Sequence, residues 1–584
     1  MTGATAPDRL LRVDLTDERV VSAPVPERWR RRYLGGKGLG ARYLYEELGP
    51  GTDPLGPGNV LLFLLGPLSG FLPGGTRYAA VTKSPLTGLF LDSYAGGEFP
   101  ATLAGALGDH VGLLVTGRAE RPVRLVVADG DAALESAETW GRDAVETGRA
   151  FPDASVACIG PAGENRVAFA TIASDEAEHH AGRGGAGAVM GAKRLKAVVA
   201  RGDPPTPGAA LDARRVRERV RFAEGDTGRW LAASGTAETV DFADAADVLA
   251  ARGWRERGFE DAEDVGVEAA REAATGREYD GDDPRGFRVE TDEGETVPRG
   301  ATGMSLGAGL GIGDFDAVAA LGERCNRLGL DLISGGNAVA LAIRAADAGH
   351  LDRDLDFGDP DAARALLVEI ATRETDLGDT LAAGVEAAAE RLGATGLVPT
   401  VKRLSLPGYD PRGAPSMALA YATSDRGGCH RRARPVEREA FEAPWHPDQA
   451  ARAVVAAQDA RAVRWSLVAD DFVGESLRVA PWLDAVDAPS GDLVRTGERI
   501  WTLVRLFNVR EGVDRTDDAL PAPLATGPDA LDEDRFDAML DAYYRRRGWG
   551  PDGRPTRATL DRLDLTTVGD DDTPLSRSSP RVDD

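Results

Sequence analysis

Cysteine is scarce in this chain of 584 residues. The three cysteines, Cys158, Cys325 and Cys429, are each more than a hundred positions from the next. No CxxC or CxxxC spacing occurs, which excludes the usual ligand patterns of zinc sites and iron–sulfur clusters. Each cysteine is most simply interpreted as a small buried hydrophobe.

Lysine is almost as rare, because only five of the 69 lysine and arginine residues are lysines. The formal net charge is -26 and the sequence pI is about 4.8. This balance argues against binding to nucleic acid or to an anionic membrane surface. An acidic, lysine-poor surface is typical of proteins kept soluble in concentrated salt, so we expect a halophilic, salt-accumulating setting.

Long apolar runs are also missing. The longest, Val60 to Leu65, ends at Gly66-Pro67 and is too short to span a bilayer. The first fifteen residues lack the charged and apolar regions of a signal peptide. We therefore expect a cytoplasmic protein that does not interact with a membrane.

The chain is too long for a single hydrophobic core, and its patterning changes near residue 203. Residues 1–203 contain short β-branched and aromatic runs bounded by Gly, Pro, Asp and Ser, with one helix near Leu39–Leu48. This pattern predicts a largely antiparallel β domain. A proline-rich linker, 202–208, follows it.

Helical periodicity dominates beyond the linker and predicts two mainly α-helical domains, 209–406 and 407–567. Residues 276–300 are polar and turn-rich and are predicted as a loop or small hairpin. The last segment, 568–584, is acidic and predicted to be disordered. The expected fold class is therefore α+β multidomain. The predicted helices are 209–222, 236–252, 261–275, one ending at 328, 337–348, 448–469, 493–507, 533–547 and 557–563.

A glycine-rich stretch, 179–196, surrounds Arg183 with five glycines, of which Gly182, Gly184 and Gly187 spell GxGxxG. A dinucleotide-binding loop follows a strand and opens a helix. Here polar residues precede the glycines and a strand-like run follows, which disfavours nicotinamide binding. Two interpretations remain: a loop that receives an anionic ligand, or a structural turn.

Two further segments carry candidate polar groups. Asp331 follows a glycine turn at a helix end, where an N-cap is the simplest interpretation. A second cluster of glycines and cations, 426–432, contains His430 among turn glycines rather than on an apolar helix face. A lone histidine is more often structural than catalytic.

Eight blocks spread over nearly the whole chain carry a shared pattern: RRYLGGKGLGARYLYEEL, LGPLSGFLPGGTRYAAVTKSPLTG, CIGPAGENRVAFATIAS, AGRGGAGAVMGAKRLKAVV, CNRLGLDLISGGNAVALAI, ATSDRGGCHRRA, GERIWTLVRLFNVREG and FDAMLDAYYRRRGWGPDGRPTRATLDRL. Taken together, they resemble the aldehyde ferredoxin oxidoreductase family. The resemblance implies a β-rich first domain that holds two pterins with tungsten or molybdenum against two helical domains, often in a homodimer. It also implies a small-molecule aldehyde as substrate and ferredoxin or another redox partner as electron acceptor.

The resemblance also implies a set of site residues. His430 matches a histidine near the metal, a candidate for proton transfer. No side chain is assigned as a ligand of the metal. The positions that match pterin contacts are Arg77, Gly96, Arg183, Gly185, Gly329, Leu330 and Asp331.

Several positions depart from the family pattern. The family binds a 4Fe-4S cluster through cysteines, but residues 276–300 contain none. The third-domain motif Asp-x-x-Gly-Leu-Cys-Lys is replaced by the sequence of residues 465–471, and the asparagine of an SNxGG turn by Tyr94. The acidic segment near the metal has become residues 298–302. These losses predict that no 4Fe-4S cluster binds, and they put the second pterin in doubt.

Two functions are compatible with these features. The first is a metal-pterin oxidoreductase that oxidises an aldehyde to a carboxylate without the iron–sulfur cluster. The alternative is a divergent, non-catalytic paralogue that keeps the fold as a ligand-binding or partner subunit.

Overall fold

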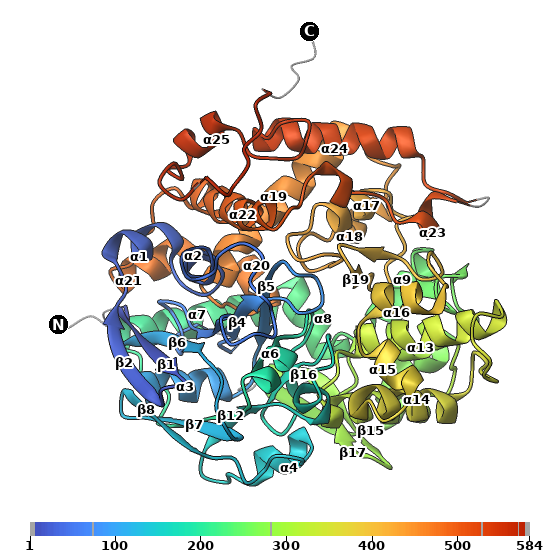
Figure 1. Ribbon diagram of the computed structural model, residues 1–584, viewed down its shortest axis with the longest axis horizontal. Coiled ribbons are helices and arrows are strands. Elements are labelled where there is room, and N and C mark those ends of the chain that lie inside the picture. The colour runs from blue at the N-terminus through green and yellow to red at the C-terminus, as the bar shows by residue number, and fades with distance from the viewer. Residues whose placement is uncertain (1–5, 73–74, 281–282, 527–528, 570, 579–584) are drawn as a thin grey trace.

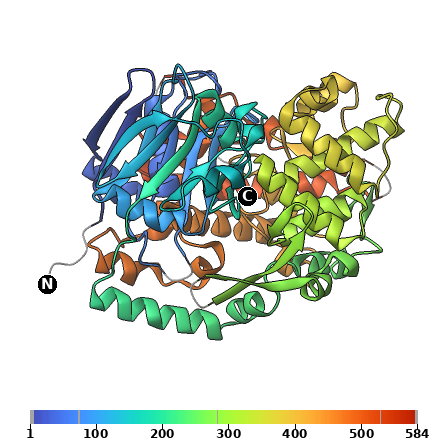
Figure 2. The same cartoon turned by 90° about the horizontal axis from the view of Figure 1, so that it is seen from below.

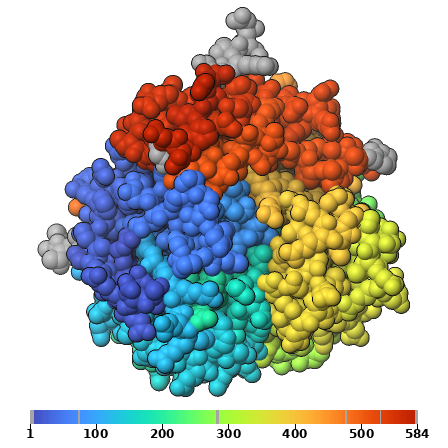
Figure 3. All heavy atoms as spheres, viewed as in Figure 1, coloured from blue at the N-terminus to red at the C-terminus, as the bar shows by residue number. Residues whose placement is uncertain are grey.

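The computed structural model describes residues 6–72, 75–280, 283–526, 529–569 and 571–578. A β-rich first region is followed by two mainly helical regions, and the three lie side by side (Figures 1 and 3). The predicted fold class, α+β multidomain, is confirmed.

Two six-stranded sheets form the first region and lie as layers in Figure 2. All strand pairs are antiparallel except β1–β6 and β12–β7, as the largely antiparallel prediction expects. The first sheet has the order β2 (Arg19–Pro24), β1 (Arg9–Asp14), β6 (His110–Thr116), β3 (Leu61–Leu64), β4 (Tyr78–Lys83), β5 (Phe90–Ala95). The second has the order β11 (His179–Ala181), β10 (Ile172–Ser174), β9 (Ser155–Cys158), β12 (Leu195–Arg201), β7 (Val123–Ala128), β8 (Asp131–Ser136).

The prediction of a single helix in this region was wrong. Besides α2 (Gly36–Glu47), the structure has α1 (Glu27–Tyr33), α3 (Phe99–Leu107), α4 (Ala144–Arg149), α5 (Pro161–Glu164) and α6 (Ala186–Ala192). Helix α2 begins at Gly36, before the predicted start near Leu39, and neighbouring backbone packs closely against its glycines. A Cβ at Gly36 would lie 2.3 Å from the Trp465 carbonyl oxygen, and one at Gly38 would lie 2.2 Å from that of Tyr33.

The second region contains helices around a small sheet. Residues 236–252 and 261–275, each predicted as one helix, instead form short pieces with strands between them. The segment predicted as a loop or hairpin is a three-stranded antiparallel sheet, β15 (Ala274–Asp280), β16 (Asp283–Thr291) and β17 (Gly294–Thr296). The other elements are α7 (Ala209–Glu224), α8 (Asp226–Ser234), α9 (Thr239–Ala245), β13 (Ala250–Ala251), β14 (Glu256–Arg257), η1 (Glu263–Val265), α10 (Val267–Glu272), α11 (Gly300–Thr302), η2 (Gly303–Gly307), η3 (Ala308–Leu310), α12 (Phe315–Leu328), α13 (Leu332–Asp347), α14 (Pro360–Thr372), α15 (Asp376–Leu381), α16 (Val385–Leu392), β18 (Thr400–Val401) and β19 (Leu404–Ser405).

Helix α13 begins five residues before its predicted start. Gly335 and Gly336 are helical rather than preceding the helix, and a Cβ at Gly336 would lie 2.6 Å from the carbonyl oxygen of Ser305. Close packing against the π-helical turn η2 therefore explains glycine inside this helix.

Long helices build the third region: α19 (Pro447–Ser466), α22 (Leu493–Arg510) and α24 (Glu533–Arg547). They share one apolar core with α2 and with one face of the first sheet. The shorter helices are α17 (Ser416–Ala422), α18 (Val436–Glu439), α20 (Asp471–Ser476), α21 (Val479–Ala485), η4 (Arg515–Asp517), α23 (Ala522–Ala525) and α25 (Arg557–Arg562).

Part of the tail predicted as disordered is packed. Thr573 is buried and its hydroxyl hydrogen-bonds that of Tyr45, and Ser576 donates its backbone N–H to the Pro555 carbonyl at 3.0 Å. The prediction is therefore wrong for these residues; 570 and 579–584 lie outside the described residues.

The strand β4 shows how the regions are joined. Tyr78 and Ala80 point into the core between the two sheets, while Ala79 and Val81 point towards α2 and the third region. Alternation of side chains along a strand thus fills two cores at once.

No single helix among the described residues is long and apolar enough to cross a membrane. The segments Gly300–Leu310 and Phe315–Leu328 meet those criteria only as a pair, bent by 113°.

Candidate functional site

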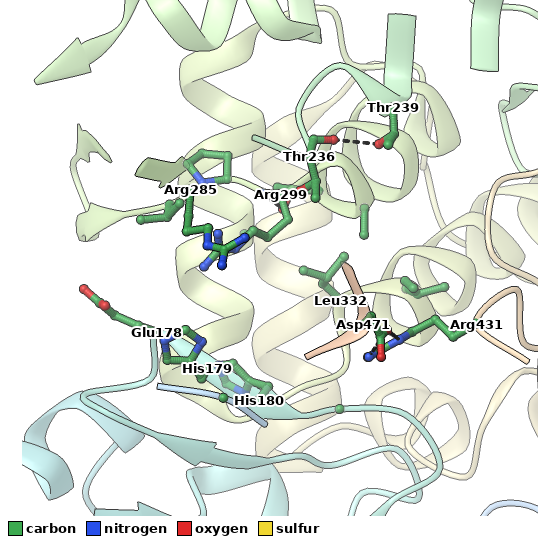
Figure 4. A pocket seen from close by; sticks show the side chains of 18 of the residues that line it. Glu178, His179, His180, Thr236, Thr239, Arg285, Arg299, Leu332, Arg431 and Asp471 are labelled. Atoms are coloured by element: carbon green, nitrogen blue, oxygen red, sulfur yellow. Dashed lines mark hydrogen bonds and ion pairs between the residues drawn. The ribbon is translucent and has the colours of Figure 1, made fainter. Parts of the chain in front are cut away.

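A cavity of about 1000 Å³ lies where the three regions meet. Figure 4 shows Glu178, His179 and His180 on the wall from the first region, Arg285 and Arg299 facing them from the second, and Arg431 with Asp471 from the third. The volume is at the upper end of the range of small-molecule and cofactor sites.

The structure brings six of the eight predicted site residues to this cavity: Arg77, Gly96, Arg183, Leu330, Asp331 and His430. Gly185 and Gly329 do not line it. Both have positive φ, +86° and +73°, and a Cβ at Gly185 would lie 2.1 Å from the Ala168 carbonyl oxygen. These two glycines shape the backbone of the loops that carry Arg183 and Asp331.

The loop of residues 182–185 joins β11 to α6, so a short strand does precede the glycines and a short helix does follow them. The sequence-based description of this context was wrong. A dinucleotide-binding unit also needs parallel neighbouring strands. Here β10 and β9 separate β11 from β12, so the loop is not part of such a unit.

Arg183 is buried and crosses between the regions. Its Nη1 donates to the Gly428 carbonyl at 2.8 Å, its Nη2 to the Ser405 carbonyl at 2.6 Å, and its Nε lies 3.3 Å from Oδ2 of Asp331. Both interpretations of this loop therefore have support: it is a structural joint, and it lines the cavity.

Asp331 is the N-cap of α13, as the simplest interpretation expected. Its Oδ2 accepts the Ser334 backbone N–H at 3.2 Å, the Ser334 hydroxyl and the Arg183 Nε–H. No hydrogen bond to Oδ1 occurs among the described residues. Asp331 lines the cavity, so this oxygen can accept a hydrogen bond from a ligand.

Arg77 ties the first region to the third. Its backbone N–H donates to Val468, and its Nη2 donates to Asp470 at 2.7 Å. Thr76 and Ala469 form an isolated antiparallel bridge beside it. The segment that departs from the family motif thus forms one edge of the cavity.

His430 is neutral in this setting. Burial, followed by the nearby Arg434 and Arg431, lowers its pKa well below the ordinary value of 6.5. Its Nδ1 is buried and has no hydrogen-bond partner among the described residues, and its ring packs 5.7 Å from that of Tyr409. His430 lines the cavity, so its ring lies beside any molecule that enters there.

The cavity has many arginines but no excess of positive charge. Six of its eight arginines form ion pairs with carboxylates that also line the cavity. A ligand is therefore oriented by hydrogen bonds more than by net attraction. The arginines are Arg77, Arg183, Arg285, Arg288, Arg299, Arg426, Arg431 and Arg434, and the carboxylates are Glu98, Asp175, Glu178, Glu238, Glu278, Asp331, Glu437, Asp470 and Asp471.

Sequence reasoning missed the polar groups of the β11 and β15–β17 walls, including His179, Glu278 and Arg299. Glu278 and Arg299 lie about a hundred positions from His179, and no spacing motif connects them. Only the docking of the small sheet against β11 brings them together.

Two of the positions that depart from the family pattern contact each other. The rings of Tyr94 and Trp465 stack with centroids 5.5 Å apart and an interplanar angle of 26°. Both are buried and neither lines the cavity. Protein side chains therefore fill the space at these two positions.

The three cysteines lie in different places and are all buried and unpaired: Cys158 in β9, Cys325 in α12 and Cys429 in the loop before His430. Within the described ranges, the one group of His, Cys, Asp and Glu side chains close enough to ligate a metal is Glu178, His179 and Glu278. No cysteine belongs to it.

Two mixed sheets held against two helical regions, with a polar cavity where they meet, define an α+β protein built around a large internal ligand site. Its first region matches the model of the aldehyde ferredoxin oxidoreductase N-terminal domain over residues 10–202, and residues 214–565 match domains 2 and 3 of the same family. The chain belongs to the aldehyde ferredoxin oxidoreductase family.

Individual relatives agree with this assignment. The chain is 34% identical to the tungsten-containing aldehyde ferredoxin oxidoreductase of Pyrococcus furiosus, over 95% of this chain and 98% of that protein. It is 33% identical to the enzyme of the same name from Thermococcus kodakarensis, with the same coverage. The aliphatic sulfonate oxidoreductase WOR-like subunit of P. furiosus is 27% identical over 95% and 96% of the two chains.

Among solved structures, the active-site complex BamBC of benzoyl coenzyme A reductase, bound to 1,5-dienoyl-CoA, has the same fold. The TM-score is 0.83 at 24% identity, and the match covers 97% of this chain and 98% of the other.

Proposed function

We propose that the protein is a metal-pterin oxidoreductase that oxidises an aldehyde to a carboxylate and passes the electrons to ferredoxin or another redox partner. The observation that carries the proposal is the convergence of Arg77, Arg183, Asp331 and His430, from segments far apart in the sequence, on one cavity. Membership of the family supplies the chemistry.

The residues on one side of the cavity fit a pterin. Asp331 Oδ1 is an acceptor for ring N–H groups, and Arg183 has one N–H group more than its four protein contacts use. Gly96 has no side chain to block the approach of a ring. When bound, a tungsten- or molybdenum-pterin would supply a Lewis acid and a two-electron acceptor.

His430 is proposed to transfer a proton during turnover, because it lines the cavity and matches a histidine near the metal in the family. His430→Ala should leave metal and pterin contents unchanged while lowering kcat by about a hundredfold or more. A loss of metal without a specific effect on kcat would instead assign His430 a structural role.

The absence of the family's 4Fe-4S cluster remains part of the proposal, together with a cytoplasmic location in a salt-rich cell. The proposal that the cluster is absent is supported by the separation and full burial of the three cysteines, Cys158, Cys325 and Cys429. The electrons then leave through a partner that docks near the cavity rather than through a resident cluster.

Elemental and pterin analysis of the protein, purified without air from its native host, is the deciding experiment. Tungsten or molybdenum with pterin, and no stoichiometric iron, is the expected result. Iron near four atoms per chain, the content of one 4Fe-4S cluster, would contradict the cluster-free proposal. Neither metal nor pterin would favour the non-catalytic paralogue.

A further inference from the structure

Three potential metal ligands meet at the cavity where the first region faces the second. Glu178 immediately precedes β11, His179 is the first residue of β11, and Glu278 lies in β15 of the small sheet. One ligand atom from each lies within 4.8 Å of the others. Figure 4 shows Glu178 and His179 on the wall below Arg285 and Arg299. The three groups therefore face one point at the edge of the cavity.

The two adjacent histidines differ in their hydrogen bonding. His180 is satisfied at both ring nitrogens, by the Thr171 hydroxyl at 2.7 Å and the Ala177 carbonyl at 2.9 Å. No hydrogen bond to His179 occurs among the described residues, and its nearest polar partner is Glu278 Oε1, 3.9 Å from Nε2. His180 is thus structural, whereas His179 keeps a lone pair for a ligand.

The ring of His179 lies against the backbone of the first region at Gly97. The neighbouring backbone leaves room for the ring, because Gly97 has no side chain: a Cβ there would lie 2.4 Å from His179 Cδ2. Glycine at this position is required for the histidine to lie where it does.

The two carboxylates are held in place by arginines. Arg299 donates to both oxygens of Glu278, at 2.6 and 2.7 Å, and Arg288 donates to Glu178 at 2.7 Å. Each carboxylate oxygen has a second lone pair, so these contacts orient the ligands without using them up, as outer partners do at metal sites.

We propose that Glu178, His179 and Glu278 bind one divalent transition-metal ion, separate from any pterin-bound metal. One imidazole and two carboxylates are ligands typical of Fe²⁺, Mn²⁺ or Zn²⁺. Three protein ligands leave further coordination positions open to the cavity. The ion would bind a carboxylate or carbonyl oxygen of a molecule that enters there.

The site can be tested on the full chain with Co²⁺ alone, after treatment with a chelator. We expect one equivalent to bind, with the visible absorption of Co²⁺ bound to nitrogen and oxygen ligands. His179→Ala and Glu278→Gln should each weaken binding by at least about tenfold, since removal of outer partners alone has that effect. His179→Gln keeps the size of the side chain and guards against misfolding.

The matched control is His350→Ala, which removes an exposed histidine outside the cavity and should leave the affinity unchanged. Equal affinity in the parent and in both His179 variants, or no stoichiometric binding to the parent, would overturn the site. The outcome is independent of the proposed function, because it is read from Co²⁺ binding, whereas the function is read from tungsten, molybdenum and pterin contents.

Discussion

Arg183 provides the sharpest test of how the cavity is held together. Its side chain is 6% exposed and its guanidinium bonds two backbone carbonyls, of Ser405 and Gly428, and the Asp331 carboxylate. Truncation to alanine leaves these acceptors buried with fewer partners. Hydrogen bonds to charged groups contribute about 1.5–3 kcal/mol each, and breaking a buried ion pair costs about 3–5 kcal/mol.

We therefore expect Arg183→Ala to lower the free energy of local opening of the loops that carry Ser405 and Gly428. The expected decrease is about 3 kcal/mol, the lower limit given above for breaking a buried ion pair. That corresponds to about a hundredfold faster hydrogen exchange. The reporters are the amides of Gly428, which donates to Val401, and Leu406, which donates to Pro399. Exchange measured by mass spectrometry on the cofactor-free protein separates this effect from any loss of ligand.

The control is Arg183→Lys, which keeps the charge but cannot bond all three acceptors at once. It should give an intermediate increase in exchange. If exchange at Leu406 and Gly428 is unchanged in the alanine variant, Arg183 does not join the regions. In that case its part in ligand binding could be read directly from pterin content.

Two other predictions concern buried charges. Lys37 is fully buried between Asp92 and Asp425. Lys37→Met should therefore lower the free energy of unfolding by about 3–5 kcal/mol. A denaturant midpoint no lower than that of the exposed-site control Arg31→Met would contradict this. Burial raises the pKa of Asp175 from 3.8 to about 7. Its stabilising contribution is therefore present at low pH and lost as pH rises through 7. The stability of Asp175→Asn relative to the parent should increase by about 1.4 kcal/mol per pH unit between pH 5 and pH 7. Equal pH profiles in denaturant titrations would refute the raised pKa.

The lack of excess positive charge in the cavity bears on how a ligand binds there. Arg77, Arg431 and Arg299 are each paired with a carboxylate that also lines the cavity. An anionic ligand must share these arginines with Asp470, Asp471 and Glu278. Hydrogen-bond geometry, and any metal ion at the Glu178–His179–Glu278 site, then decides which ligand is held.

Local pattern was sufficient to predict several elements. The helix predicted at 533–547 has those bounds in the structure, because Asp532 caps its start and Gly548, with φ of +68°, ends it. The β-branched runs of residues 1–203 became strands for the same reason: each signal lies within a few residues of the structure that it specifies. The eight blocks were also sufficient to recognise the family, because both the blocks and their order along the chain can be read from the sequence.

Tertiary packing decided the rest. Glycines at the start of α2 and α13 lie before the predicted starts of these helices, yet they are helical in the structure, where neighbouring backbone packs closely against them. Arg183 meets carbonyls 222 and 245 positions away, and Glu178 meets Glu278 across two regions. Periodicity and capping act over a few residues, whereas which distant side chains share a cavity depends on how whole sheets and helices dock.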